Sequence, residues 1–484
     1  MGSIFRSTDP TTFDDVDGIV INESAPSPNI VGSPANIAIL VGQFQRGSAN
    51  VLKEVSSIGE FHEQYGKSSF SGNVALKNKK FGRLRVIRVV AAAAVAASKA
   101  FQSSVTDRIT FTAKQGVGAY GNNIQVKIEA GSTTGKKYTI KDTNALAVLS
   151  EEVYDNVLIA SVVSAATFAN SALVTAVVNS SVAEPDNIAF TSLASGSDGT
   201  VADTDYQTSI AIAEVEKAGN ILFLDAYNGV RNGYLKQHAA DTADKMVVLA
   251  GLESDTVANA IADVPSFRDA DGRLIYAYPW VETVVDGAPV MVQPASFYAS
   301  LLSQIAPNID PAYTQNTQFL AGITNLKRQL TRNDYIQLMA AGISSFEFDQ
   351  DVGFVVKSGI TTQIANSSKV TILRRRMADY YGDSVARFLK NYQGAPNSKE
   401  KRREVQGSIL AFDNQQIQLK ILPGDSEVSS GKARLIDTES LNTDISVGLG
   451  FMKILIKRRI FSSMRFIVLQ LELGETVVVT EVEA

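Results

Sequence analysis

Two segments in which strands alternate with helices flank a segment made almost entirely of short strands, and this order limits the folds open to the chain. Residues 30–90 and the residues from about 203 onward show the first pattern, in which short apolar runs alternate with amphipathic stretches, as in βαβ units. Between them, residues 101–190 are rich in Thr, Val, Ser and Asn and alternate apolar with polar positions. The simplest topology is one α/β domain interrupted by a mostly β inserted domain.

Single elements are expected where apolar runs end at turn residues. A short helix capped by Ser56 should stop at Gly66, and another should cover residues 257–264. Buried strands of the α/β domain are expected at residues 37–41, 84–89, 221–224, 246–250 and 274–278. Strands of the inserted domain are expected at residues 109–113, 124–128 and 173–177.

Residues from 346 onward are expected to form a last, α+β domain. Its clearest element is an amphipathic helix, predicted by apolar residues that recur three and four positions apart. These residues are Leu373, Met377, Tyr381, Val385 and Phe388. Strands are expected at 415–421, 452–456 and 466–473. The predicted organisation is therefore an N-terminal arm (1–25), a discontinuous middle α/β domain (26–91 and 201–345), an inserted β-rich domain (92–200), the last domain (346–473) and a C-terminal arm (474–484).

Both arms contain a short β-branched or apolar run without an evident partner strand. Such a strand leaves backbone N–H and C=O groups unpaired, so it needs the edge of a sheet. It can fold back onto its own domain or add to a sheet of a neighbouring copy. The two runs consist of Gly18, Ile19, Val20 and Ile21, and of Thr476, Val477, Val478, Val479 and Thr480.

Composition excludes several kinds of chemistry. The 484 residues include no Cys and only two His, His62 and His238, so thiol chemistry is absent and general bases near neutral pH are few. No paired-carboxylate signature stands out, and we expect no catalytic residues, no cofactor and no metal. A net charge of −5 argues against a dedicated nucleic-acid binder. The first residues lack an apolar core of signal-peptide length, so a soluble, non-secreted protein is expected.

Two glycine-rich motifs resemble phosphate-binding loops, but each lacks the context that this function needs. Residues 116–121 match GxGxxG, yet residues 124–128 alternate like a strand, so no helix N-terminus faces a pyrophosphate. Residues 131–137 resemble a P-loop with one residue too few between the glycines and no Ser or Thr after Lys136. Both motifs are therefore interpreted as turns between strands.

Charge is unevenly spread over the last domain. Residues 346–471 hold 19 Lys+Arg and 13 Asp+Glu, whereas the segment beyond adds only Glu472, Glu475, Glu481 and Glu483. A basic body with an acidic tail suits docking on acidic protein surfaces and alignment of like copies. The basic clusters are Arg374, Arg375 and Arg376, and Lys399, Lys401, Arg402 and Arg403; the ordinary interpretation of such clusters is a solvated helix face.

Taken in order, short motifs along nearly the whole chain resemble contractile tail sheath proteins of myovirus-type bacteriophages and related contractile particles. The segment 344–348 departs from the family pattern, which usually has a tryptophan there. The motifs are Pro28, the run 37–42, Arg46-Gly47, Ser56, Phe61, Tyr65-Gly66, the run 86–89, the turn 118–123, the linker 195–199 with Asp205-Tyr206, Tyr278-Pro279-Trp280, Pro294-Ala295-Ser296, Ala321-Gly322-Ile323, Ala341-Gly342-Ile343 and the segment 372–376.

The resemblance implies a structural subunit with no enzymatic activity. Family members stack as six-fold rings around a tail tube, with the C-terminal domain facing the tube. Their terminal arms add strands to the inner sheets of neighbouring subunits. Contraction from a metastable extended state drives the tube through the host envelope. The implied partners are further copies of the chain, the tail tube protein, and baseplate and tail-terminator or neck proteins, without nucleic acid or membrane insertion. The implied location is the virion, assembled in the bacterial cytoplasm.

From this resemblance we derive a hypothesis and keep three alternatives. The hypothesis is that the basic residues around 374–376 or 399–403 grip the tube. The alternatives are the sheath of a contractile injection particle, another structural component such as a tube or capsid subunit, and a nucleotide-binding enzyme. A helix after Gly121 or a bound cofactor would favour the enzyme.

Overall fold

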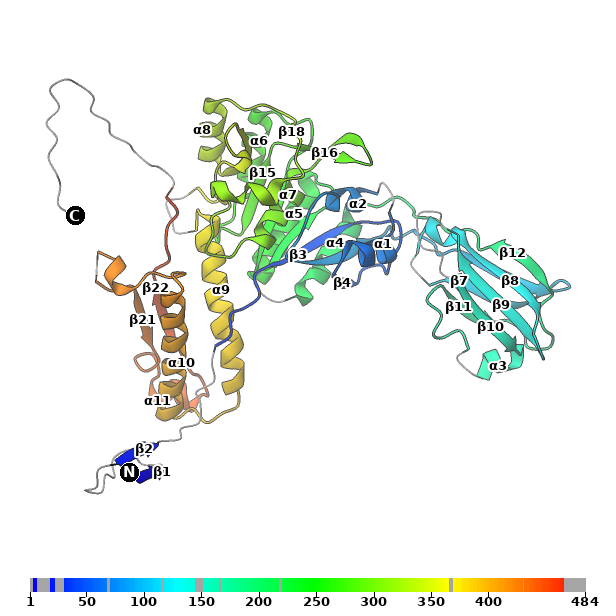
Figure 1. Ribbon diagram of the computed structural model, residues 1–484, viewed down its shortest axis with the longest axis horizontal. Helices are drawn as coiled ribbons and strands as arrows, with labels where there is room; N and C mark the ends of the chain where they lie inside the picture. Colours follow the sequence, from blue (N-terminus) through cyan, green and yellow to red (C-terminus); the bar gives the residue numbers. More distant parts are fainter. Residues whose placement is uncertain are drawn as a thin grey trace.

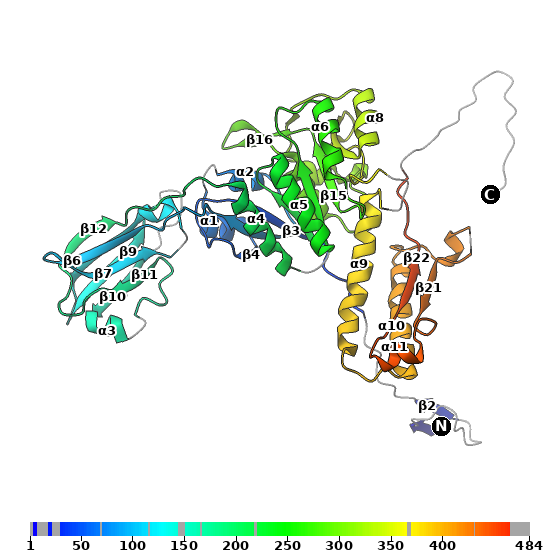
Figure 2. The same cartoon turned by 180° about the vertical axis from the view of Figure 1, so that it is seen from behind.

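The chain forms three bodies in a row, as seen in its computed structural model: a β sandwich, a central α/β body and a C-terminal pair of helices with a hairpin (Figure 1). Seen from behind, the sandwich projects from one side of the central body and the helix pair from the other (Figure 2). The structure describes residues 3–6, 18–21, 30–67, 70–114, 117–143, 151–164, 167–216, 220–364, 369–429 and 431–464.

The central body is built on an eight-stranded sheet with the order β20-β19-β15-β14-β13-β3-β5-β4. The six inner strands run parallel, and the edge strands β4 and β20 are antiparallel to their neighbours. Strands β13, β14 and β15 are buried along their whole length, which explains their continuous apolar sequence. The strands are β3 (Ile37–Gln43), β4 (Leu52–Val55), β5 (Arg83–Val89), β13 (Asn220–Leu224), β14 (Lys245–Ala250), β15 (Leu274–Tyr278), β19 (Ile343–Asp349) and β20 (Gly353–Val356).

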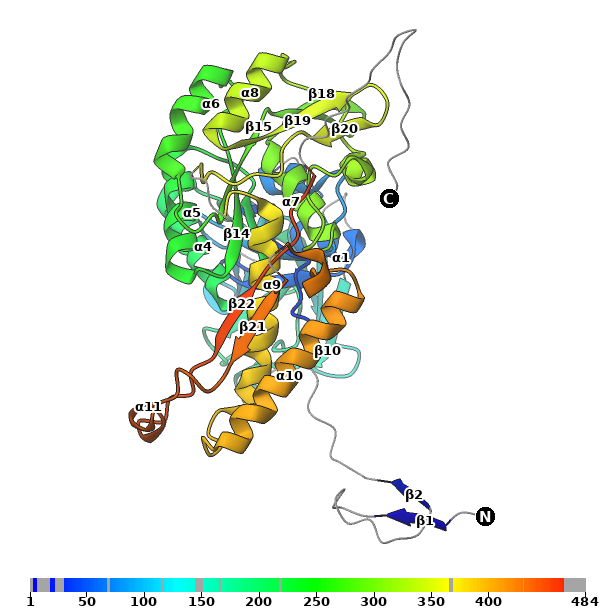
Figure 3. The same ribbon diagram turned by 90° about the vertical axis from the view of Figure 1, so that its left-hand side faces the viewer.

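Helices cover both faces of this sheet, with α4 and α5 on one side and α7 on the other (Figure 3). Helix α7 (Pro294–Gln304) is buried over nearly its whole surface, and its first turn is capped by Gln293, which accepts a hydrogen bond from the Ser296 backbone. The other helices are α1 (Ile58–Tyr65), α2 (Ser71–Leu76), α4 (Asp203–Ile212), α5 (Gly229–Thr242), α6 (Val257–Asp263) and α8 (Arg332–Ala341). A small sheet beside them contains β16 (Val281–Val285), β17 (Ala288–Val292) and β18 (Asn325–Leu326).

The inserted segment between β5 and α4 forms two antiparallel sheets that share one apolar core. One sheet has the order β10-β9-β8-β12 and the other the order β11-β7-β6. Phe111, Tyr138 and Phe168 meet edge to face at the centre of this core. The elements are β6 (Ser98–Ser103), β7 (Thr106–Ala113), β8 (Ile124–Ala130), β9 (Lys136–Asp142), β10 (Glu151–Val157), α3 (Ile159–Ser164), β11 (Val174–Val178) and β12 (Ile188–Ser192).

The C-terminal body packs the predicted amphipathic helix against a second helix and a hairpin. Leu373, Met377, Tyr381, Val385 and Phe388 all lie in its core, so this prediction is confirmed. The elements are α9 (Ile372–Leu389), α10 (Lys399–Gln418), β21 (Arg434–Asp437), α11 (Asp444–Gly448) and β22 (Leu455–Arg458). Short 3-10 helices occur along the chain at Ala119–Asn123, Ala213–Val215, Val264–Phe267, Thr314–Leu320, Lys390–Tyr392 and Asp425–Glu427.

Several expected boundaries are wrong. The domain boundary at 345/346 falls inside β19, which pairs with both β15 and β20, so the central sheet continues to Val356. The strand expected at 415–421 is instead the last turn of α10 and the chain after it, because Val405, Ile409 and Phe412 set a helical buried face that Gln416 continues. The strand expected at 452–456 is β22, which starts later, and α1 is capped by Ser57 rather than Ser56.

Candidate assembly interface

The two basic clusters lie at opposite ends of the C-terminal helix pair. Helix α9 runs away from the central body, and α10 runs back beside it (Figure 1, Figure 3). Since α10 has 20 residues and a helix rises about 1.5 Å per residue, the first turns of the two helices are separated by roughly 30 Å along the pair. The structure therefore does not bring the clusters together into one surface.

At the start of α9, the three arginines have different roles. Arg376 is 5% exposed, and its guanidinium donates to the backbone oxygens of Leu302 at 2.7 Å and Ile305 at 3.0 Å, so it closes the end of α7. Burial lowers the pKa of Arg376 to about 10. Arg375 pairs with Asp379, and Arg374 donates to the Ser462 hydroxyl. The expectation that Arg376 lies on a solvated face is thus wrong, because it joins two bodies of the chain.

At the start of α10, the cluster is mostly solvent-facing. Lys399, Lys401 and Arg403 are exposed, and Lys401 pairs with Glu404 at 2.7 Å. Arg402 is 8% exposed and is held by Glu439, at 3.3 and 3.2 Å from its Nε and Nη2 atoms. Arg402 is therefore a structural residue, and three of the four predicted cations remain available to a partner.

An apolar tip, which sequence reasoning missed, lies at this same end of the helix pair. It is formed by the loop from β21 through α11 to β22, and Asn397, just before α10, donates to the Phe451 backbone oxygen at 2.9 Å. Large apolar side chains that gather on an exposed surface commonly mark protein contacts. The sequence did contain a signal for this tip, because four large apolar residues occur within eleven positions of an otherwise polar loop. The apolar tip consists of Leu441, Ile445, Leu449 and Phe451, which are 44%, 77%, 69% and 57% exposed.

Beside the helices, β21 and β22 form a two-stranded sheet whose position is fixed by a buried carboxylate. Asp413 of α10 is fully buried and pairs with Arg434 of β21 and Arg458 of β22, each at 2.8 Å. Burial and the Asp413 carboxylate raise the pKa of Tyr381, which faces the same group. Within the described part of the chain no third strand joins this sheet, so each strand has one unpaired edge.

Of the two predicted terminal strands, the structure describes one. Residues 18–21 form β2 (Gly18–Ile21), as expected, and pair in parallel with β1 (Ser3–Arg6) from Ser3↔Gly18 to Arg6↔Ile21. This pair lies beyond the far end of the C-terminal helices and away from the central body (Figure 1, Figure 3). The second run, residues 476–480, and the strand expected at 466–473 lie outside the described residues.

Besides the buried Asp413 pairs within the C-terminal body, another buried ion pair joins α9 to the central sheet. Arg273, which precedes β15, donates through both terminal nitrogens to Asp379 of α9 at 3.0 Å, and both side chains are largely buried. One turn further along α9, burial and the neighbouring Asp379 raise the pKa of Asp383 to about 6. The guanidinium of Arg376 and this pair together fix the helix pair to the central body.

The sandwich is fixed to the central body by a third buried ion pair. Arg46, which follows β3, lies 3.0 Å from Asp142 of β9 and donates to the hydroxyl of Tyr120, while Tyr120 donates to the same carboxylate. The exposures of the Arg46 and Asp142 side chains are only 6% and 3%. A buried pair of this kind holds two bodies in one orientation, because separating them would leave charges without partners.

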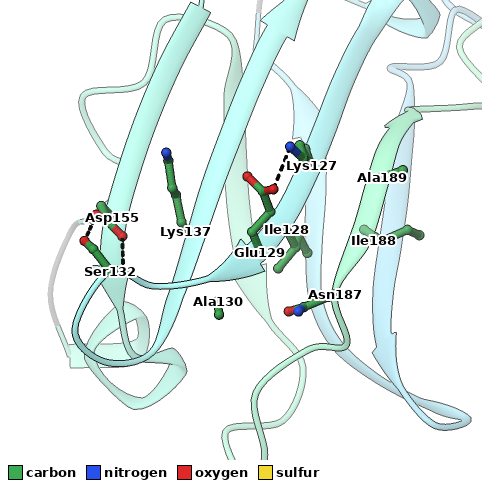
Figure 4. A pocket seen from close by; sticks show the side chains of 10 residues that line it. All are labelled: Lys127, Ile128, Glu129, Ala130, Ser132, Lys137, Asp155, Asn187, Ile188 and Ala189. Carbon is green, nitrogen blue, oxygen red and sulfur yellow. Dashed lines mark hydrogen bonds and ion pairs between the residues drawn. The ribbon is translucent and has the colours of Figure 1, made fainter.

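The glycine motifs are turns, as predicted. Gly118 precedes a 3-10 turn that contains Gly121 and leads directly into β8, so no α-helix follows the GxGxxG pattern. Ala119, the first residue of this turn, donates its N–H to Asp198. Residues 131–135 connect β8 to β9. Near this turn lies an open hollow of about 730 Å³ on the outer face of the sandwich (Figure 4). Lys127 pairs there with Glu129 at 2.6 Å, and Asp155 accepts hydrogen bonds from Ser132, so these charges are already satisfied.

The residues that the structure describes contain no group of three or more His, Asp or Glu side chains arranged to hold a metal ion. Among these residues, none of the helices combines the length and apolar character needed to cross a bilayer.

Comparison with known proteins defines the class by its fold. No protein-family model matches the sequence, and no curated protein matches it. Among solved structures, a sheath tail protein from Listeria innocua superposes with a TM-score of 0.64 and 16% identity over 85% of this chain and 90% of that one. A sheath tail protein from Desulfitobacterium hafniense gives a TM-score of 0.61 with 16% identity over 92% of this chain and 100% of that one.

A contractile particle shows the same architecture. The helical sheath of the anti-feeding prophage, in its contracted state, superposes with a TM-score of 0.58 and 14% identity over 95% of this chain and 99% of that one. The chain is thus a mixed α+β protein of several sheets. Its fold is that of contractile tail sheath proteins, as the ordered sequence motifs indicated.

Proposed function

We propose that this chain is the structural subunit of a contractile tail sheath. Copies polymerise as helically stacked six-fold rings around a tail tube, and contraction from a metastable extended state drives the tube through the host envelope. One observation carries the proposal: in a chain with the sheath fold, the sheet β21–β22 has two unpaired edges among the described residues. The particle is a phage tail, or alternatively a contractile injection particle, since the fold occurs both in sheath tail proteins and in the helical sheath of the anti-feeding prophage.

The unpaired edges are the acceptors for the terminal strands of neighbouring subunits. Residues 18–21 and 476–480 each supply a short run that can add to such an edge. If a strand forms roughly five backbone hydrogen bonds of about 1 kcal/mol each, one added strand contributes a few kcal/mol. Head-to-tail contacts of this type generate open helical filaments, which is the form that a sheath needs.

The far end of the helix pair is the surface that meets the tube. Exposed cations at Lys399, Lys401 and Arg403 lie there beside the apolar tip, whereas Arg375 and Arg376 are engaged within the chain. An apolar centre with polar residues at its edge is the usual composition of a protein interface. These contacts favour the start of α10, rather than the start of α9, as the tube contact in this proposal. Baseplate and neck proteins would bind the two ends of the assembled sheath, and the particle would form in the bacterial cytoplasm.

The test is negative-stain electron microscopy of the purified chain beside a variant that lacks residues 1–24. Hollow tubes from the full chain alone are expected. A proline at Val20 should act like the truncation, because proline removes a ladder N–H, while Val20→Thr serves as the matched control. Monodisperse subunits from every variant, including the full chain, would contradict sheath assembly and would direct attention to a bound small molecule.

The tube contact has its own test. Lys399→Glu with Arg403→Glu should abolish decoration of purified tail tubes, because like charges would then face an acidic surface. Arg374→Glu, in the first turn of α9 at the other end of the helix pair, should leave decoration unchanged. The assignment is wrong if the double variant decorates tubes normally, or if only the Arg374 variant fails.

A further inference from the structure

A basic groove lies where the first turn of α9 meets the chain that follows β22. Its volume is about 660 Å³, within the range of sites that enclose a small ligand or a short peptide segment. Ser462, two residues before the end of the described segment, forms part of its wall. Among the residues that line it, five carry positive charge and one, Glu427, carries negative charge. The five cations are Lys369, Arg374, Arg375, Arg458 and Arg459.

Three of these cations already have a carboxylate, and two do not. Arg375 pairs with Asp379, Arg458 with Asp413 and Lys369 with Asp271. Arg374 instead donates to a neutral hydroxyl, on Ser462. Arg459 is exposed, and its side chain has no ion pair with any described residue.

The single carboxylate of the groove does not compensate for this excess. Glu427 accepts the backbone N–H of Gly424 at 2.8 Å, so it serves a local turn. The groove therefore presents two uncompensated guanidinium groups, from Arg374 and Arg459, and it is complementary to a short segment that carries carboxylates.

The chain contains one segment of that composition close by. Residues 472–484 hold four glutamates and no Lys or Arg, and they begin ten residues after Ser462. They lie outside the described residues. Because the chain leaves the groove at Ser462, this segment has a high effective concentration there, whereas a segment of another copy must arrive by diffusion.

Sequence also supplies the turn that would bring the acidic residues back. Gly474-Glu475 separates two strand-like runs, and glycine in the first of two loop positions is typical of a type II′ hairpin. With residues 473 and 476 paired across this turn, Glu481 lies opposite Val468 and Glu483 opposite Phe466. Residue 466 follows Ser462 by only four positions, so Glu481 and Glu483 return towards the groove.

We propose that, before assembly, each chain docks its own acidic segment 472–484 in the basic groove, with Glu481 and Glu483 facing Arg374 and Arg459. This inference rests on the proposed function, in which the run 476–480 links neighbouring subunits. Docking would keep that run on its own subunit until assembly. Exposed charge pairs of this kind are weak and are screened by salt, so an incoming neighbour can displace the segment.

The experiment uses the absence of cysteine from the sequence. Val428→Cys, in the groove wall, and Ala484→Cys are labelled with spin labels in the full, unassembled chain, and their separation is measured. A short distance is expected at low ionic strength and should disappear at about 1 M salt, where the screening length is about 3 Å. Glu481→Gln with Glu483→Gln should abolish it, as should Arg374→Gln with Arg459→Gln.

Controls separate this result from general loss of charge. Lys399→Gln with Arg403→Gln removes two cations at the far end of the helix pair and should leave the short distance intact. Exchange of charge between groove and segment, with Arg374→Glu, Arg459→Glu, Glu481→Arg and Glu483→Arg together, should restore it.

Three outcomes overturn the inference. These are the absence of a short distance in the full chain, its persistence in the Arg374→Gln, Arg459→Gln variant, and its appearance only between singly labelled copies that have been mixed. The last outcome would mean that the groove binds a neighbour instead. Tube formation is measured separately, in the full chain and in the Glu481→Gln, Glu483→Gln variant, whose segment should be released. Tubes without docking in the full chain refute only this inference, whereas the absence of tubes from both proteins refutes the sheath proposal.

Discussion

Replacing Asp413 with asparagine should release the β21–β22 hairpin from α10 without unfolding the rest of the chain. The carboxylate is fully buried and lies 2.8 Å from each of two guanidinium groups. Removing one partner of a buried ion pair costs about 3–5 kcal/mol. Arg434 is 26% exposed and can regain water, and Arg458 keeps the backbone oxygens of Ala433 and Pro423. The expected cost is therefore at the lower limit, about 3 kcal/mol.

Hydrogen exchange is the appropriate assay, because a chain of several bodies does not unfold in a single two-state step. A loss of about 3 kcal/mol should speed exchange of the β21 and β22 amides roughly 100-fold, since each 1.4 kcal/mol is a factor of ten. Amides of β14 should not change and serve as the internal reference. Glu400→Gln, an exposed substitution in the first turn of α10, should leave both regions as they are. Unaltered protection of the hairpin in Asp413→Asn would refute the reasoning.

Three further outcomes are expected. Arg46→Met should weaken the attachment of the sandwich to the central body by about 3–5 kcal/mol, because Asp142 loses its buried partner. Small-angle scattering should then show a broader range of sandwich orientations, whereas Arg108→Met, within the sandwich, should leave the scattering unchanged. Burial and Asp379 raise the pKa of Asp383 to about 6, so its contribution to stability is lost as pH rises from about 4 to 6. Burial lowers the pKa of His238 to about 4, so its contribution is lost as pH falls from about 6.5 to 4 and opposes that of Asp383 over the shared range. In urea titrations at several pH values, Asp383→Asn should therefore make stability fall more steeply as pH is lowered from about 6 to 4, whereas His238→Gln should make stability fall as pH is raised over the same range.

Elements whose apolar pattern is set by burial could be predicted from sequence. Strands β13, β14 and β15 are covered on both faces, so their residues form unbroken apolar runs, and α9 has one buried stripe that gives the three- and four-residue spacing. Residues 415–421 misled the same approach, because Ile417, Leu419 and Ile421 alternate like a strand although α10 continues to Gln418. The first of these residues are helical because they continue the buried stripe of the preceding three turns of α10.

The candidate interface could be predicted only in outline. Composition identifies basic clusters, but it does not show that Arg376 lies against the backbone of residues 302 and 305, about seventy positions away in sequence, or that Arg402 is held by Glu439. The apolar tip is visible as exposed only once its loop has been placed. Under the proposed function, the edge that receives a terminal strand lies on another copy of this chain, and the placed hairpin is what shows that β21 and β22 offer such edges.

The segment that enters the central body from the N-terminal side has a mechanical consequence. Ile30 packs in the core of the helix pair, the Ser33 N–H donates to the Ser384 hydroxyl at 2.8 Å, and a few residues later the chain becomes β3, between β13 and β5. Tension on the N-terminal arm is therefore borne first by the contacts with α9 and then by two hydrogen-bonded ladders loaded along the strand axis. When the force acts along the strand axis, all hydrogen bonds of a ladder resist it together. An N-terminal arm under tension would therefore move the whole subunit as a rigid body and would not separate the strands of its sheet one bond at a time.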